Sequence, residues 1–198
     1  MKIKSATFIT SAKGLSGCPD WAHPEFAFIG RSNVGKSSMI NMLSNQKALA
    51  KVSATPGKTR LLNFFLMNER WSLVDLPGYG FAKTSKGEKL DFLELVGDYL
   101  EQRENLRRVF VLIDSRHKPQ QIDLEFISWL ENTGAPFSLI FTKADKQSPA
   151  KTRASITLFQ ETLARLIQSD PEVLVSSSLH RSGREDILRS IQRSLDLQ

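Results

Sequence analysis

The sequence predicts an α/β fold with a doubly wound, mostly parallel six-stranded sheet flanked by helices. Short apolar segments alternate along the chain with amphipathic ones, which is typical of strands joined by crossover helices. The apolar segments are nearly continuous, as expected for strands that are covered on both faces. Only residues 68–70 separate the second segment from the third. Because this connection is too short for a crossover, we expect one antiparallel hairpin strand.

The individual elements follow from the periodicity of apolar residues. The segments typical of strands are 25–30, 61–67, 71–75, 109–114, 137–142 and 173–175. Between them, apolar residues recur every three or four positions and predict helices around 90–100, 122–130, 156–167 and 187–195. Residues 3–9 can add a strand at one edge of the sheet. No repeat or Pro/Gly/Ser-rich linker is found, so we expect residues 1–22 to be an N-terminal extension and residues 23–198 to be a single domain.

Composition excludes several classes of protein. Hydrophobic residues make up 40% of the 198 positions and charged residues 24%, which argues against disorder. Cys18 is the one cysteine, so no internal disulfide can form. No apolar run approaches the roughly 18 residues that a membrane span needs, and the first residues lack the apolar centre of a secretory signal. We expect a cytoplasmic protein without a membrane span, with a monomer as the default state.

The positive charge is concentrated in one part of the chain. The net charge is +6, and residues 1–68 contain nine Lys or Arg against two acidic residues. Within this part, segment 46–60 has four basic residues and no acid. A polyanionic partner such as RNA is consistent with this excess, and an ordinary solvated surface is the alternative.

The strand predicted at 25–30 ends in a phosphate-binding motif. Gly30-Arg-Ser-Asn-Val-Gly-Lys-Ser37 matches G-x-x-x-x-G-K-[ST]. Its glycines let backbone N–H groups surround phosphates, and the next helix adds the positive end of its dipole. Lys36 is expected to reach the β- and γ-phosphates, and the Ser37 hydroxyl to ligate Mg²⁺. An incidental glycine-rich turn is the alternative, but the placement between a strand and a helix favours the phosphate site.

A second motif, Asp75-Leu-Pro-Gly78, closes the third predicted strand. A carboxylate at Asp75 can hold the Mg²⁺ through a water, and the Gly78 N–H can meet the γ-phosphate. Alone, the pattern D-x-x-G is too common to decide the function. Its position at the end of a strand makes it informative beside the phosphate-binding motif.

Two further signals concern the base of the nucleotide. Thr142-Lys-Ala-Asp145 closes the fifth predicted strand, and its carboxylate can accept hydrogen bonds from N1–H and N2–H₂ of guanine. Adenine lacks that pair of donors, so Asp145 selects GTP over ATP, unless it is only a solvated loop acid. Ser177 and Ser178, followed by Gly183, can offer a backbone N–H to guanine O6, although serines are also common at helix entrances as caps.

With these motifs in this order, the sequence resembles the translation-factor-like (TRAFAC) class of P-loop GTPases. It is more closely similar to the EngB/YsxC/YihA family of bacterial GTP-binding proteins. The resemblance is carried by GRSNVGKSS (30–38), TPGKTRLLNFF (55–65), VDLPGYGFAK (74–83) and TKAD (142–145). It implies a P-loop GTPase fold, GTP hydrolysis, a role in assembly of the large (50S) ribosomal subunit, and a link to cell division and septation.

The resemblance also implies residue roles. Thr59 corresponds to the switch threonine that completes Mg²⁺ coordination, with an ordinary exposed loop residue as the alternative, and the expected catalytic residues are Lys36, Thr59 and Gly78. The implied GTP contacts are Gly30, Arg31, Ser32, Asn33, Val34, Gly35, Lys36, Ser37, Ser38, Gly57, Lys58, Thr59, Arg60, Leu61, Asp75, Leu76, Pro77, Gly78, Thr142, Lys143, Ala144, Asp145, Ser176, Ser177 and Ser178.

Two departures from the wider GTPase pattern affect the expected chemistry. Thr142 replaces the commoner Asn and makes fewer ties than an amide, which predicts a modest nucleotide affinity. Tyr79 stands where many GTPases have the Gln that orients the attacking water, which predicts slow intrinsic hydrolysis. Outside help is then needed: a K⁺ ion bound beside Asn33, as the resemblance suggests, or the ribosomal particle acting as activator.

Segments 46–60 and 78–89 are expected to be switches ordered by the γ-phosphate. The basic segment 46–60 then makes contact with ribosomal RNA dependent on the nucleotide. A second basic group near the C-terminus either extends this surface or forms a solvated helix face: Arg181, Arg184, Arg189 and Arg193. The competing functions are a nucleotide or small-molecule kinase, and a non-catalytic GTP/GDP-responsive interaction module at the division site.

Overall fold

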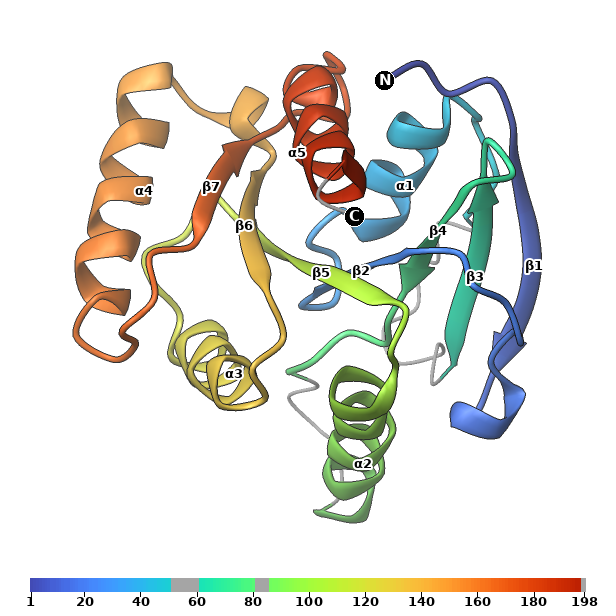
Figure 1. Ribbon diagram of the computed structural model, residues 1–198. Helices are drawn as coiled ribbons and strands as arrows, with labels where there is room; N and C mark the ends of the chain where they lie inside the picture. Colours follow the sequence, from blue (N-terminus) through green and yellow to red (C-terminus); the bar gives the residue numbers. More distant parts are fainter. Residues whose placement is uncertain (51–60, 81–85, 197–198) are drawn as a thin grey trace.

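The computed structural model describes residues 1–50, 61–80 and 86–196. A seven-stranded sheet with the order β1-β3-β4-β2-β5-β6-β7 lies between two layers of helices (Figure 1). The strands are β1 (Ala6–Ala12), β2 (Glu25–Gly30), β3 (Leu62–Met67), β4 (Trp71–Asp75), β5 (Leu106–Asp114), β6 (Phe137–Thr142) and β7 (Glu172–Val175). The helices are α1 (Lys36–Ser44), α2 (Lys86–Gln102), α3 (Gln121–Asn132), α4 (Pro149–Leu163) and α5 (Arg184–Asp196), with 3₁₀ turns η1 (Leu15–Gly17) and η2 (Ala144–Lys146).

The sheet is parallel through β4, β2, β5, β6 and β7 and antiparallel at one side. The expected hairpin joins β3 and β4, and Asn68 and Glu69 in its turn have φ of +53° and +55°. The sheet has seven strands rather than six because β1 pairs antiparallel with β3, which adds a second antiparallel pair. The apolar-run criterion underestimated β1 because only its two end residues, Ala6 and Ala12, are buried.

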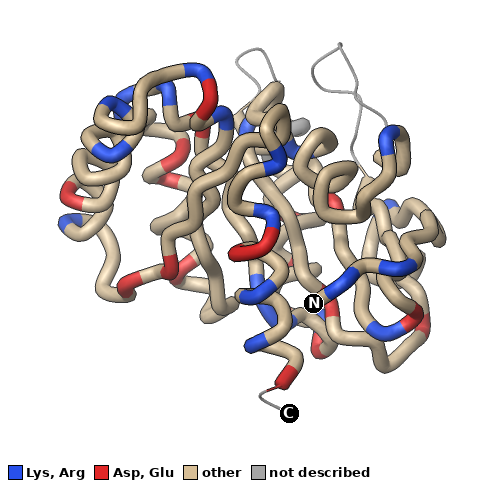
Figure 2. The backbone as a smooth tube through the Cα atoms, turned by 90° about the horizontal axis from the view of Figure 1, so that it is seen from above, with Lys and Arg blue, Asp and Glu red and all other residues tan. Residues whose placement is uncertain are grey.

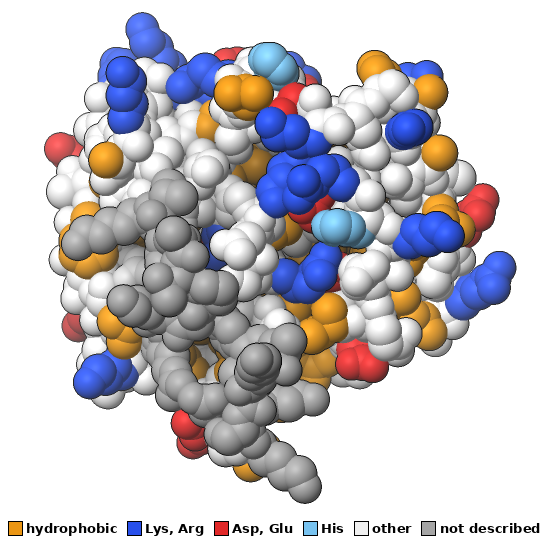
Figure 3. Space-filling model, turned by 180° about the vertical axis from the view of Figure 1, so that it is seen from behind, with side chains coloured by type: hydrophobic (Ala, Val, Ile, Leu, Met, Phe, Trp, Pro, Cys, Tyr) orange, Lys and Arg blue, Asp and Glu red, His pale blue; other side chains and the backbone are white. Residues whose placement is uncertain are grey.

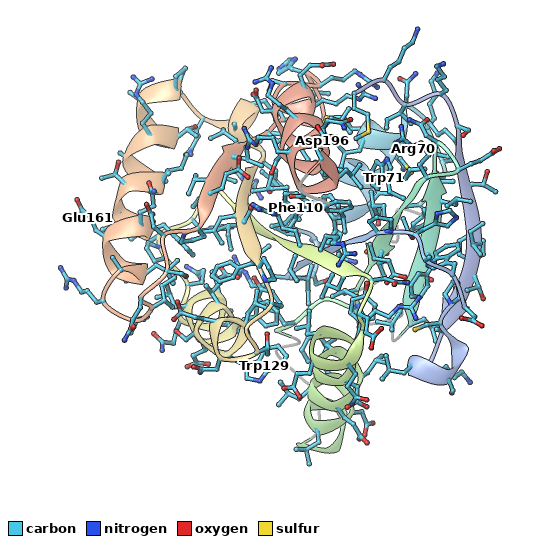
Figure 4. All side chains as sticks on the ribbon, viewed as in Figure 1. Arg70, Trp71, Phe110, Trp129, Glu161 and Asp196 are labelled. Atoms are coloured by element: carbon cyan, nitrogen blue, oxygen red, sulfur yellow. The ribbon has the colours of Figure 1, made fainter. Side chains whose placement is uncertain are left out.

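The strand β2 is buried along its whole length. Phe26 and Phe28 pack with residues of α1 and α5, whereas Ala27 and Ile29 pack with residues of α2, α3 and α4. Phe28 stacks on Phe110 of β5 with ring centroids 4.9 Å apart, in the layer of side chains where Figure 4 labels Phe110. Two separate cores therefore explain why the strand sequence is apolar without alternation.

A buried ionic network fixes the amino end of β2. Glu25 is fully buried, and its Oε1 accepts hydrogen bonds from Trp21 Nε1 (2.8 Å) and Arg103 Nη2 (2.6 Å). Its Oε2 accepts one from Tyr99 Oη (2.8 Å). Both carboxylate oxygens are thus satisfied by the protein, and the network ties the segment before β2 to the end of α2.

The arginines near the C-terminus make contacts within the protein. Arg184 donates from Nε to the Met42 carbonyl and from Nη2 to the Leu43 carbonyl, both at 2.9 Å, and so caps the end of α1. Arg193 donates to Glu172, and Arg189 lies 3.0 Å from Asp186. Acidic and basic residues are interspersed along this part of the chain (Figure 2). These contacts favour a structural role over an RNA-binding one.

Candidate functional site

The phosphate-binding motif forms a loop between β2 and α1, as its sequence predicts. Gly30 ends β2, and a Cβ atom there would lie 2.8 Å from Val34 Cγ1 and 2.9 Å from the Leu112 carbonyl oxygen. Gly35 precedes α1 with a φ of +104°, a conformation that disfavours any side chain. The loop backbone therefore depends on both glycines, and the first-turn N–H groups of α1 point toward it.

Lys36, the first residue of α1, meets Asp75 at the carboxyl end of β4. Phe28 of β2 pairs with Asp75 of β4 in the sheet register. The Lys36 ammonium donates to Asp75 Oδ1 and, at 2.6 Å, to the Leu76 carbonyl. Asn63 Nδ2 also donates to Asp75 Oδ2 at 3.4 Å, a partner that the sequence analysis missed. Ser37 and Ser38 follow on the first turn of α1 and are partly exposed.

The segment after β4 lies directly on the phosphate loop. A Cβ atom at Gly78 would lie 2.7 Å from the Gly30 carbonyl oxygen, so only glycine allows this approach. Leu76 and Pro77 are buried beside it. This contact brings the Gly78 backbone next to the loop that is expected to hold phosphates.

The Tyr79 side chain is buried against α3. Its side chain is stacked on Phe126 of α3 with ring centroids 4.2 Å apart, and its hydroxyl donates to Asp123 Oδ1 at 2.9 Å. Burial and the neighbouring Asp123 raise the pKa of Tyr79 well above its ordinary value. A phenol held in this way is not placed to orient a water, and the slow hydrolysis expected from Tyr79 stays a prediction.

Thr142 and Lys143 tie the end of β6 to the phosphate loop. The Thr142 hydroxyl lies 2.8 Å from the Val34 carbonyl oxygen, and Lys143 Nζ donates to the Asn33 carbonyl at 2.6 Å. The Thr142 hydroxyl thus ties β6 to the phosphate loop, and the modest nucleotide affinity expected from the missing amide stays a prediction. Lys143 Nζ also donates to Asp114 Oδ2 at 2.9 Å.

Asp145 has a buried carboxylate with one oxygen bonded and the other without a hydrogen bond from the described residues. Its side chain is 5% exposed, and its Oδ1 accepts a hydrogen bond from Ser177 Oγ at 2.6 Å. Its Oδ2 is buried, lies 3.4 Å from Lys146 Nζ and accepts no hydrogen bond within the described part of the chain. The Ser177 hydroxyl holds the pKa of Asp145 below its usual range, so the carboxylate is ionised at neutral pH.

The serines after β7 form the wall beside Asp145. Ser176 N–H donates to the Phe141 carbonyl (2.8 Å), and its own carbonyl accepts from Ala144 N–H (3.2 Å). Gly183 closes this loop with a φ of +76°, and a Cβ atom there would lie 2.0 Å from the Val175 carbonyl oxygen. Ser178 is partly exposed at the same loop. The structure therefore brings the serine segment 176–178 next to Asp145, which Ser177 contacts directly.

Asp114 is a member of this edge that the sequence analysis did not identify. It ends β5, and Arg116 donates to its two oxygens from Nε (2.9 Å) and Nη2 (2.8 Å). Burial opposes ionisation, but the hydrogen bonds from Arg116 and Lys143 prevail and hold its pKa well below its usual range. Its position at the end of an apolar strand, like that of Asp75, was the available signal.

The same edge carries a basic surface, which we define by its residues Arg116, His117, Lys118, Lys143 and Lys146. Arg116, His117 and Lys146 each expose 40% or more of their side chains. Figure 3 shows this face, where Lys and Arg side chains gather beside a histidine.

Part of the expected site falls in the segments that the structure does not describe. Gly57, Lys58, Thr59 and Arg60 lie outside the described residues, as do segments 51–60 and 81–85 of the expected switches. Leu61 is described and is partly exposed. The remaining nucleotide-contact candidates all lie at the carboxyl ends of β2, β4, β6 and β7, where open α/β sheets bind ligands.

The fold and the order of these motifs define the class of protein as a P-loop GTPase. Residues 25–143 match a family model described as a 50S ribosome-binding GTPase. The chain is 50% identical over 192 residues to the probable GTP-binding protein EngB of Christiangramia forsetii, covering 97% of both chains. It is also 50% identical over 192 residues to the protein of the same description in Bacteroides thetaiotaomicron, covering 97% of this chain and 95% of the relative. The chain belongs to the EngB family of GTP-binding proteins.

Solved structures agree with this fold. The crystal structure of a probable GTP-binding protein engB matches with a TM-score of 0.70 and 22% identity, covering 88% of this chain and all of that one. Era in complex with MgGDPNP and nucleotides 1506–1542 of 16S ribosomal RNA matches with a TM-score of 0.66 and 21% identity. That match covers 86% of this chain and 56% of Era. Within the described residues, no helix has the length and apolar character of a membrane span.

Proposed function

We propose that this chain is a slow GTPase that acts as a nucleotide-dependent switch in assembly of the large ribosomal subunit, with a link to cell division and septation. One observation carries the proposal: Oδ2 of Asp145, which is buried, lies 3.4 Å from Lys146 Nζ and accepts no hydrogen bond from the described residues, is at the same sheet edge as the loop Gly30–Ser37. A guanine base and its phosphates fit these two features together: the Asp145 carboxylate distinguishes guanine from adenine, and the loop supplies the phosphate site.

Guanine recognition rests on the ionised Asp145 carboxylate. Ser177 keeps Oδ1 in place, so the carboxylate can accept from guanine N1–H and N2–H₂ without reorganising. The Lys143 stem is expected to lie across the base. The Ser176 and Ser177 N–H groups already donate to the Phe141 and Ser182 carbonyls, so the backbone N–H of Ser178 is proposed as the donor for guanine O6, with Ser176 and Ser177 holding the segment in place. The kinase alternative predicts no such receptor for guanine, and an adenine base would leave the carboxylate without donors.

Phosphate and metal binding require Lys36 and Asp75 to change partners. Ser37 and Asp75 present hydroxyl and carboxylate oxygens, which fit Mg²⁺ as ligands, directly and through a water respectively; Thr59 is proposed as the third residue of this set. When bound, Mg²⁺ neutralises charge on the phosphates. Lys36 then leaves Asp75 to hold the β- and γ-phosphates, and Gly78 N–H meets the γ-phosphate.

Hydrolysis is proposed to be slow without a partner. Water attacks the γ-phosphate in line, and Lys36 and the loop N–H groups stabilise the developing charge. Because the Tyr79 hydroxyl is bonded to Asp123, the side chain that directly follows Gly78 is not placed to orient that water. GTPases in this situation turn over at about 10⁻⁴ s⁻¹. A K⁺ ion beside Asn33, or the ribosomal particle, is proposed to supply the missing stabilisation.

The proposed partner is ribosomal RNA of the large subunit or its precursor. The basic surface defined above lies beside the proposed nucleotide site. The basic segment 46–60 is proposed to extend it when GTP is bound. We further propose a cytoplasmic monomer in which residues 1–22 extend the single GTPase domain 23–198 and add β1 to its sheet. The buried Tyr79 in place of Gln also favours a second candidate, a non-catalytic GTP/GDP-responsive module at the division site.

Co-sedimentation with 30S and 50S particles tests this function. The protein is incubated with a non-hydrolysable GTP analogue or with GDP, and GTP turnover is measured with and without the particles. Binding to 50S in the GTP state together with faster hydrolysis supports the assembly switch. Absence of binding in both states overturns the ribosomal role and leaves the division-site module as the better account.

A further inference from the structure

Asp123 joins three segments that are far apart in the sequence. It lies in the first turn of α3 and is 1% exposed. Its Oδ1 accepts a hydrogen bond from Tyr79 Oη (2.9 Å) and lies 3.1 Å from Arg31 Nε. Arg31 directly follows Gly30 in the phosphate loop, and Tyr79 directly follows Gly78. One carboxylate oxygen therefore links the phosphate loop, the segment after β4 and the helix α3.

The backbone around this carboxylate is closely packed. Arg31 and Tyr79 form a parallel β-bridge, which places their backbones side by side. Gly80 has a φ of +84°, and a Cβ atom there would lie 2.8 Å from Ile122 Cδ1 at the start of α3. Together with the approach of Gly78 to Gly30, these contacts hold residues 78–80 between the phosphate loop and α3. A small shift of Tyr79 would be transmitted to the Gly78 backbone.

The bonding of Asp123 is incomplete for a purely stabilising carboxylate. Its Oδ2 is buried and accepts no hydrogen bond from the described residues, and Arg31 contacts it with one nitrogen while 25% of the arginine side chain is exposed. Burial raises the pKa of Asp123, with Arg31 opposing that rise. A buried polar atom left unpaired costs stability. This unpaired oxygen is consistent with a carboxylate whose role is to hold two chain segments, those of Arg31 and Tyr79, in place.

We propose that Asp123 is a positioning residue for recognition of the γ-phosphate: by holding Tyr79 and Arg31 together, it fixes the Gly78 N–H beside the phosphate loop. The inference rests on the proposed function, since it requires Gly78 to meet the γ-phosphate. GDP lacks that phosphate and contacts the loop, Lys36 and Asp145 without Gly78. Loss of Asp123 therefore weakens binding of GTP more than binding of GDP.

The test compares affinities for GDP and for a non-hydrolysable GTP analogue in Asp123→Asn. We expect the affinity for the analogue to fall about tenfold, as for loss of one hydrogen bond to a charged group, and GDP affinity to change less than twofold. Tyr79→Phe, which keeps the stack on Phe126 and removes only the hydroxyl, is the second variant if Asp123→Asn does not fold. It is expected to shift the ratio of the two affinities in the same direction.

Glu25→Gln is the matched control, because Glu25 is a buried carboxylate with a Tyr and an Arg at the other end of β2. It should lower the melting temperature and leave the ratio of affinities unchanged. If the wild type binds both nucleotides and Asp123→Asn has the same ratio of affinities, through equal losses or no loss, the positioning role alone is overturned. A wild type that binds neither guanine nucleotide overturns the proposed function and this inference with it.

Discussion

Near each end of β2, a buried carboxylate contacts an arginine and a tyrosine, but only the carboxylate at the amino end has both oxygens hydrogen-bonded within the described part of the chain. At the amino end, Glu25 receives Arg103, Tyr99 and Trp21, and both of its oxygens are bonded. At the carboxyl end, Asp123 receives Arg31 and Tyr79 on one oxygen, and the other has no hydrogen bond within the described residues. A closed network of this kind contributes rigidity, whereas an open one lies where the chain is expected to meet a ligand.

The difference extends along both edges of the sheet. At the carboxyl edge, Asp145 Oδ2 is also buried and accepts no hydrogen bond from the described residues, and Lys36 is bonded to Asp75, which is expected to serve the metal. At the amino edge, Glu172 is bonded by Ser190 at 2.5 Å and by Arg193. Both edges therefore contain ion pairs, but at the carboxyl edge two buried carboxylate oxygens, Oδ2 of Asp145 and Oδ2 of Asp123, accept no hydrogen bond from the described residues. Substitutions at the two edges should separate stability from nucleotide binding.

The largest effect is expected at the amino edge. Arg103→Leu leaves Glu25 buried without its cation and should lower the free energy of unfolding by about 3–5 kcal/mol. GDP affinity, measured below the melting temperature, should change less than twofold. Chemical denaturation provides the first quantity, with the exposed Arg153→Leu on α4 as a control that should cost less than about 0.5 kcal/mol. A loss below about 1 kcal/mol for Arg103→Leu would show that the network is not a source of rigidity.

The next largest effect is expected at the carboxyl edge, where nucleotide affinity should change and stability should not. Asp145→Asn removes the charged acceptor for guanine and should weaken GDP binding about a hundredfold, because two charge-assisted hydrogen bonds are affected. The unfolding free energy without nucleotide should change by less than about 1 kcal/mol. A fluorescent GDP titration measures the affinity, with the exposed Asp170→Asn as a matched charge control. A change below fivefold would remove Asp145 from guanine recognition.

The smallest effect comes from one identical substitution made at both ends of β2. Tyr99→Phe and Tyr79→Phe each remove a hydroxyl that donates to a buried carboxylate, and each should cost about 1–2 kcal/mol of stability. Only Tyr79→Phe should alter the ratio of GTP-analogue to GDP affinity. Equal ratios in the two variants would mean that the ends of β2 do not differ in function.

The sequence predicted those features that depend on residues close together in the chain. The loop Gly30–Ser37, the hairpin and the strand-end positions of Asp75 and Asp145 follow from spacing and from nearly continuous apolar runs. The strand β1 was less evident because its middle residues, including Phe8 and Ile9, are exposed. The partners of Glu25 and Asp123 lie far away in the chain, and no periodicity relates them. Asp114 and Asn63 escaped notice because a lone polar residue in or beside a strand carries no motif.

Displacement of fluorescent GDP from the wild-type protein tests the central claim, that the carboxyl edge is a receptor for guanine nucleotides, most directly. GTP, GDP, ATP and ADP are titrated in turn with Mg²⁺ present. The account predicts that both guanine nucleotides compete and that the adenine nucleotides bind at least about a hundredfold more weakly, since adenine offers Asp145 no donor pair. Displacement by ATP at concentrations within tenfold of those required for GTP would contradict it.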